Sequence, residues 1–285
     1  MKSLRPWMLV AALLAATSCS GGSEQQPDAL VPEPPPAEAA NPESPDVTKE
    51  TLEKTAENVA LVPSPMETQR ALERTGVETE LAALIQDREF DVSNTDVDNA
   101  AVRTGVVIAD LLLTVKTSSN EDLLDRMEQV QKGMTQLDGG QDILRTIDDI
   151  KERVRADAVT RDELLKELDE LSGAIIPELE FNGRERVVPL IQAGSWLEGA
   201  NLLAKAVKAA GRPDAADGLL KQPSVVDYFL TYVRTKGAEQ APEAVTKKLE
   251  ESLITLKGIA NKSEPLDMED IDNVIQTTDD VLALL

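Results

Sequence analysis

Apolar residues recur at alternating steps of three and four along much of this chain. This spacing places them on one face of an α-helix, where they can be buried together. No stretch alternates convincingly at every second position, so a β-sheet is not expected. The pattern therefore predicts an all-α fold, and its clearest stripes are Leu123, Met127, Val130, Met134 and Leu137; Ile143, Ile147, Ile150 and Val154; Leu164, Leu168, Leu171 and Ile175; and Val245, Leu249, Leu253 and Leu256.

Capping and turn signals divide these stripes into separate helices. A Ser or Thr followed three residues later by Glu predicts a capping box at a helix start. Glycine-containing turns are predicted at residues 138–140, 182–183 and 211–213. We expect a bundle of about ten helices over residues 49–285, as one domain or as two that divide near residue 182. The predicted capping pairs are Ser64 with Glu67, Ser118 with Glu121, and Thr160 with Glu163.

Residues 1–18 have the three parts of a bacterial export signal. Lys2 and Arg5 give a basic start, residues 7–16 form an apolar centre, and small residues follow. An apolar centre of this length is shorter than the roughly 20 residues that a membrane-spanning helix needs. The segment therefore predicts a cleavable signal peptide.

The residues just after the apolar centre, 16–19, read Ala-Thr-Ser-Cys and resemble the lipobox of bacterial lipoproteins. The resemblance implies cleavage before Cys19 and attachment of lipid to its sulfur, which would anchor the protein to a membrane. Cys19 is the single cysteine of the chain, so the mature protein would have no thiol left for disulfides or catalysis. An ordinary secretory signal preceding a cysteine is the alternative. In lipoproteins of this kind a serine after the lipid-bearing cysteine, here Ser20, implies sorting to the outer membrane. We expect the protein to face the periplasm.

Residues 19–48 have the composition of a disordered acidic tether. They contain seven prolines, six acidic residues and no basic residue. Proline-rich chain of this kind is extended and cannot bury a core. At about 3 Å per residue the tether could place the helical domain up to roughly 90 Å from the lipid.

Several classes of chemistry are missing from the sequence. The chain has no histidine, which removes the commonest general base and the commonest zinc ligand. It also contains no phosphate-binding loop, dinucleotide fingerprint or nucleophile elbow. We therefore expect a protein that is not an enzyme, with no metal site, no cofactor and no catalytic residue.

The charge of the chain is strongly acidic. Removing Lys2 and Arg5 with the signal leaves 27 of 29 basic residues against 52 acidic ones, a formal charge of −25. Such a charge repels nucleic acids and anionic lipid surfaces. No nucleic-acid partner is expected, whereas a basic protein partner is compatible with it.

Two segments are apolar nearly all round and look like central helices. Residues 100–115 carry a narrow polar stripe that includes Arg103 and Asp110, and residues 191–207 carry another that includes Glu198. Small residues around position 194 would let another helix approach closely. One interpretation is that both stripes face water and Trp196 fills the core. The other is that they face each other across a polar cleft, with Arg103, Asp110, Trp196 and Glu198 as candidate ligand-binding residues.

Three short stretches in these segments resemble a family of uncharacterised exported helical proteins of Gram-negative bacteria. They are residues 63–67, 105–111 and 193–199. The resemblance implies an all-α fold and export, and it transfers no activity.

We expect a lipid-anchored, non-enzymatic periplasmic lipoprotein that binds a protein partner or scaffolds an assembly of the cell envelope. A lipoprotein that binds or senses a small ligand in a cleft between the two central helices is the alternative.

Overall fold

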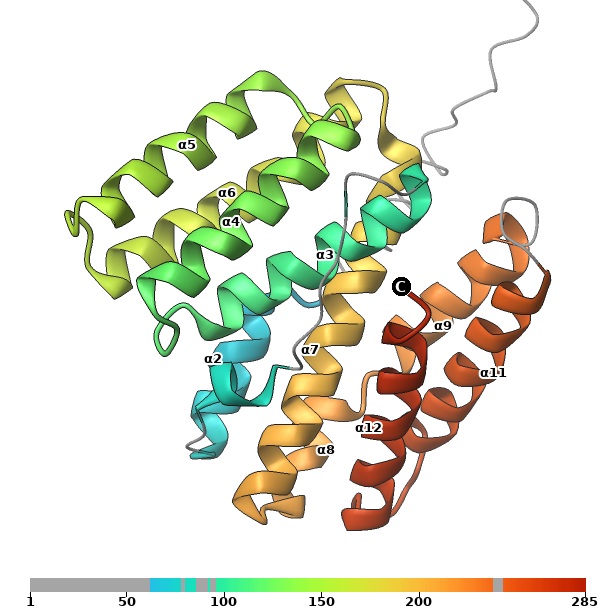
Figure 1. The fold of residues 1–285 in the computed structure, drawn as a ribbon. Helices are drawn as coiled ribbons and strands as arrows, with labels where there is room; N and C mark the ends of the chain where they lie inside the picture. The colour runs from blue at the N-terminus through green and yellow to red at the C-terminus, as the bar shows by residue number, and fades with distance from the viewer. Residues whose placement is uncertain (1–61, 78–79, 86–91, 93–95, 238–242) are drawn as a thin grey trace, which may run out of the picture. The chain divides into compact units, whose positions relative to one another are not determined.

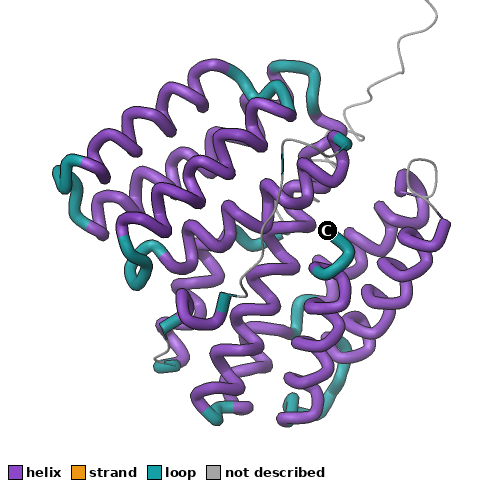
Figure 2. The backbone as a smooth tube through the Cα atoms, in the orientation of Figure 1, coloured by secondary structure: helices purple, strands orange, loops and turns teal. Residues whose placement is uncertain are grey.

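The described residues form an all-α bundle, as the sequence predicts. In the computed structural model they are helices joined by loops, with no strand among them (Figure 1, Figure 2). The predicted signal peptide, Cys19 and the tether lie outside the described residues. The structure describes residues 62–77, 80–85, 92, 96–237 and 243–285.

Ten α-helices fall within these ranges, in agreement with the expected number. Three short 3-10 helices, η1 (Leu81–Leu84), η2 (Glu185–Val187) and η3 (Pro213–Ala215), and one π-helix, η4 (Val233–Gly237), lie between them. The α-helices are α2 (Pro65–Thr75), α3 (Val97–Thr114), α4 (Asn120–Gln136), α5 (Gln141–Arg155), α6 (Arg161–Phe181), α7 (Val188–Ala210), α8 (Ala216–Leu220), α9 (Pro223–Tyr232), α11 (Glu243–Ala260) and α12 (Met268–Leu282).

Side-chain caps begin several of these helices where the sequence predicts them. Ser64 and Thr160 each form a reciprocal capping box with the predicted glutamate. The predicted cap at Ser118 is wrong by one residue, because Ser119 caps α4 and pairs with Asp122. Ser118 instead donates from its hydroxyl to Thr114 Oγ1 at 3.0 Å. A short side chain can cap only when its backbone is extended, and that conformation falls at Ser119.

The predicted stripes of α4, α5 and α6 form one apolar core. In Figure 1 these three helices lie side by side on one side of α3. Every stripe residue from Leu123 to Ile175 is buried. Full burial of one such side chain stabilises the fold by roughly 1.5–3 kcal/mol relative to exposure. We refer to this core, which also takes in one face of α3, as the packed core.

A second apolar core lies on the other face of α3. It joins that face to α7, α8, α9, α11 and α12, and we refer to it as the C-terminal core. Adjacent residues of α3 therefore belong to different cores: Val106 belongs to the C-terminal core and Val107 to the packed core. All described residues fall in one compact unit. The turn at Asn182 and Gly183, near which the sequence would place a domain division, connects α6 to η2 and α7.

Two glycines allow α3 and α7 to touch through their backbones. A Cβ atom added to Gly105 would lie 2.0 Å from the carbonyl oxygen of Ile191, and one added to Gly194 would lie 2.0 Å from the carbonyl oxygen of Val102. No side chain fits at either position. The close approach predicted from the small residues near position 194 is therefore confirmed, and its partner helix is α3.

None of the described helices combines the length and the apolar character that crossing a bilayer requires.

Candidate functional site

An apolar pocket of about 160 Å³ opens within the C-terminal core. The N-terminal parts of α3 and α7 form one side of it, and α9, Val233 of η4, α11, α12 and the residues after α12 form the rest. Leu249, Leu253 and Leu256, which the sequence predicts as the buried stripe of α11, line it together with Val281. An apolar cavity of about 150 Å³ in another protein stays dry and binds benzene. The pocket is therefore large enough for a small apolar molecule or part of a chain.

Trp196 forms a wall of this pocket and is held in place on two sides. Its indole Nε1 donates to the Gln222 side-chain oxygen at 2.8 Å, and Gln222 in turn donates to the Leu219 carbonyl at 3.0 Å. The Trp196 ring packs against Phe229 with centroids 5.4 Å apart. A side chain fixed in this way offers a rigid apolar surface to a ligand.

The aromatic residues of α9 continue this wall. Phe229 and Tyr232 are three residues apart on one helix face and both line the pocket. Tyr228 packs against Phe229 with centroids 5.1 Å apart. Burial raises the pKa of the Tyr232 hydroxyl; the charge of Asp98 adds to the rise and that of Arg186 opposes it. The Tyr232 hydroxyl therefore lies in the field of an ion pair.

That ion pair joins the start of α3 to η2 beside the pocket. Arg186 donates from Nη1 to Asp98 Oδ2 at 3.1 Å, and its Nη2 lies 2.8 Å from Asp98 Oδ1. The Asp98 and Arg186 side chains are 32% and 50% exposed. Asp98 lines the pocket, and the polar lining is completed by Asn99, Tyr232 and Ser252. Most of the pocket lining is thus apolar. A few polar side chains complete it, and one of them, Asp98, belongs to a partly exposed ion pair.

Of the four residues predicted to bind a ligand, Trp196 lines this pocket. Arg103, Asp110 and Glu198 are not among its lining residues. Glu198 is fully buried in α7, Asp110 is 7% exposed in α3, and Arg103 is half-buried. Their helices meet at the glycine contact, where backbone touches backbone. The polar cleft between Arg103, Asp110 and Glu198 stays a prediction.

Most of the polar stripe of α7 faces α12. Asn201 donates from Nδ2 to Thr278 Oγ1 and to Asp279 Oδ1, both at 2.8 Å. Lys205 donates to the same Asp279 oxygen at 3.0 Å. One turn further, Lys208 lies 2.6 Å from Asp272. The stripe therefore holds α12 against α7, which fixes one wall of the pocket.

Local sequence pattern does not reveal that the other lining residues surround a pocket. The stripe of α11 has the spacing of any buried helix face, and spacing alone does not show whether the space opposite is filled. Asp98 and Arg186 are 88 residues apart, and their pairing depends on the tertiary fold.

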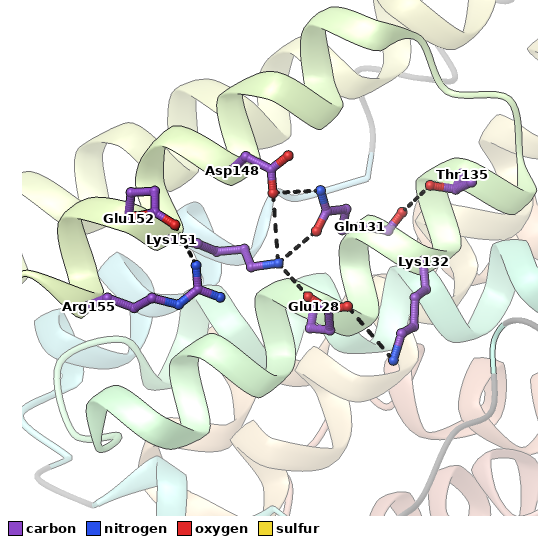
Figure 3. Close-up of polar contacts among 8 residues, drawn as sticks. All are labelled: Glu128, Gln131, Lys132, Thr135, Asp148, Lys151, Glu152 and Arg155. Carbon is purple, nitrogen blue, oxygen red and sulfur yellow. Dashed lines mark hydrogen bonds and ion pairs between the residues drawn. The ribbon is translucent and has the colours of Figure 1, made fainter.

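A second polar cluster, centred on the buried Lys151, lies between α4 and α5, away from the pocket. Figure 3 shows Lys151 of α5 reaching toward Glu128 and Gln131 of α4. Its ammonium group donates to Glu128 and, at 2.7 Å, to Gln131 Oε1, and it lies 3.8 Å from Asp148. The Lys151 side chain is 6% exposed. The Lys151 ammonium group occupies the position that a metal cation would take among these oxygens. Its contacts with Glu128 and Gln131 link α5 to α4.

Among the described residues, no group of three or more acidic side chains is arranged to hold a metal ion.

The three stretches that resemble an exported family come together in the structure. Residues 105–111 and 193–199 contain the two contact glycines, and Thr68, just after the first stretch, lies 3.8 Å from a Cβ placed on Gly199. No protein-family model, no curated protein and no solved structure matches this chain. The resemblance stays a prediction. The pocket's own chemistry is the basis on which a function is proposed.

Proposed function

We propose that this chain is a lipid-anchored protein of the bacterial envelope whose helical domain binds a small apolar ligand in the pocket of the C-terminal core. The proposal rests on the lining of the pocket. About 160 Å³ of space is surrounded by leucine, valine and aromatic side chains and by few polar groups. Ligand sites in proteins are largely apolar with a few placed polar groups. This favours small-ligand binding, the alternative raised from the sequence.

A rigid frame around the pocket supports this proposal. The glycine contact fixes α3 against α7, Trp196 is held by Gln222 and Phe229, and α12 is joined to α7 by Asn201 and Lys205. A pocket held open before binding spares a ligand the cost of ordering it.

Binding is tested with octan-1-ol, a neutral probe, by titration calorimetry of the full chain carrying Cys19→Ala in detergent-free buffer. We expect saturable binding of one molecule per chain. Ala193→Leu should abolish it, because Ala193 lines the pocket and leucine would fill the space. The matched control is Ala174→Leu on the exposed side of α6, which should bind like the parent. Absence of binding by the parent chain, or equal binding by Ala193→Leu, would contradict the proposal.

Anchoring through Cys19 is a separate part of the proposal, supported by the sequence alone. Acyl chains bind a protein to a bilayer at about 0.8 kcal/mol for each buried CH₂ group, and more than one chain makes the anchor firm. Cys19→Ala should release the protein from membranes and prevent incorporation of labelled fatty acid. Continued labelling of the variant would refute lipidation at this residue.

Binding of a protein partner in the envelope stays a prediction. The large apolar side chains that are clearly exposed belong to different elements, and the most exposed of them is Phe181 at the end of α6, at 86%. Crosslinking in the native envelope, with Phe181→Ser as the comparison, tests it. A partner recovered with the parent and lost with the variant would support a surface at the end of α6, and recovery of no protein would count against the prediction.

A further inference from the structure

The pocket lining has a single charged side chain, and that side chain is acidic. Among the described lining residues it belongs to Asp98. Its carboxylate is at the first turn of α3; Oδ1 is buried, and the side chain as a whole is 32% exposed, so a ligand entering from solvent can reach part of it. An apolar body bound in the pocket would bring its polar end near this oxygen pair.

Asp98 already has a partner, with which a ligand cation must compete. Arg186 is 50% exposed, lies outside the pocket lining, and contacts both carboxylate oxygens, at 3.1 and 2.8 Å. Such a two-point pair is stronger than an ordinary exposed ion pair. A ligand cation would displace it only because the apolar pocket holds the cation beside the carboxylate at the same time.

The aromatic residues of the chain are concentrated around the same pocket. Trp196, Phe229 and Tyr232 line it, and Tyr228 packs on Phe229. Within the described ranges the one aromatic residue elsewhere is Phe181. Ring faces attract cations by roughly 0.5–2 kcal/mol when the cation is close to the ring.

From this arrangement, and resting on the function proposed above, we infer that the pocket selects hydrophobic ammonium compounds. The apolar body would lie among Leu253, Leu256 and the Trp196 ring, and the ammonium group would lie at Asp98 beside the Tyr232 ring. The formal charge of −23 on the whole chain also favours the approach of cations over anions.

Three probes that share an alkyl body test the inference: octylammonium, octan-1-ol and octanoate, each titrated calorimetrically into the full chain carrying Cys19→Ala. Octylammonium should bind about tenfold more tightly than octan-1-ol, and octanoate more weakly than both. Raising the salt concentration should reduce the advantage of octylammonium, because the contact with Asp98 is partly exposed.

Two substitutions should act in opposite directions on octylammonium. Asp98→Asn removes the carboxylate and should lower its affinity about tenfold. Arg186→Gln removes the competing cation and should raise it several-fold. The matched control Asp125→Asn, an exposed change on α4, should leave all three affinities unchanged.

Equal affinities for the three probes, tighter binding of octanoate, or weaker binding of octylammonium by Arg186→Gln would overturn the inference. In each of these cases octan-1-ol still binds, and the proposed apolar site stands. If none of the three probes binds, the proposed function itself fails.

Discussion

The two cores on either side of α3 are built from similar residues, but one is filled and the other contains a pocket. In the packed core the stripes of α4, α5 and α6 are buried throughout, and Leu123 and Met134 have no exposed surface. In the C-terminal core a pocket of about 160 Å³ remains between α7, α9, α11 and α12. The difference shows that leucine stripes with the same spacing can build either a filled interior or the walls of a site.

The difference between a filled core and a pocket follows from the packing partners of each helix. α4, α5 and α6 follow one another through short turns and pack as neighbours. In the C-terminal core the aromatic side chains of α7 and α9 stand opposite α11, while Asn201 and Lys205 hold α12 through polar contacts. These polar contacts set the position of α12 against α7, and the space beside Val281 stays unfilled.

The shared frame of both cores should be the most sensitive point. Gly105→Ala forces a Cβ atom against the Ile191 backbone, and we expect it to lower the free energy of unfolding by about 4–5 kcal/mol, the upper end for single substitutions. Gly173→Ala in α6 is the control, because no atom lies within 4 Å of its Cβ position. It should stabilise the protein by about 0.5–1 kcal/mol. Chemical denaturation measures both. Similar values for the two variants would show that the helix crossing is not tight.

Truncation of leucine should cost more in the packed core than at the pocket. Leu123→Ala should lower the free energy of unfolding by about 3–4 kcal/mol, because it opens a new cavity in a filled interior. Leu256→Ala at the pocket should cost about 2 kcal/mol, since one side of that side chain already faces unfilled space. Equal losses in denaturation experiments would argue that the pocket is closed in solution.

Replacing alanine by leucine should also affect the two cores differently, because added atoms overpack a filled core and fit into a pocket. Ala101 is fully buried in the packed core, so Ala101→Leu should destabilise the protein by about 1–3 kcal/mol through overpacking. Ala193→Leu adds the same atoms into the pocket and should change stability by less than about 1 kcal/mol. Thermal unfolding of the two variants compares them directly. A large loss for Ala193→Leu would contradict the proposed free volume.

Acid should lower the stability of the fold slightly, through carboxylates beside both cores. Hydrogen bonding from Lys151 lowers the pKa of Glu128 below its ordinary 4.5, and the Leu266 backbone N–H lowers that of Asp217 below 3.8, with Lys221 contributing. Carboxylates of this kind stabilise the folded state above their unfolded pKa, and the contribution is lost as the pH falls through the folded pKa.

Glu128→Gln and Asp217→Asn should therefore be less stable than the parent at pH 7, with the difference shrinking below about pH 4. Urea denaturation at pH 7 and at pH 3 measures this for each variant. A difference that persists unchanged at pH 3 would assign the loss to packing.

The fold was largely predictable and the site was not, for identifiable reasons. Helices α4, α5 and α6 follow from local spacing and capping, with an error of one residue at Ser119. Gly194 indicated a close helix contact because only small residues allow one. The sequence groups Arg103, Asp110 and Glu198 with Trp196 because the polar stripes of the two central helices could face each other across a cleft. The orientation of each polar stripe depends on which helix packs beside it, and the position of α12 was not available from local pattern.

Methyl NMR of the full chain carrying Cys19→Ala, titrated with octan-1-ol, tests most directly whether the ligand binds in one core and not in the other. We expect saturable shifts for the methyl groups of Leu253, Leu256 and Val281 around the pocket, with those of Leu123 and Ile147 in the packed core unchanged. Shifts spread equally over both cores, or no shift at the pocket, would contradict it.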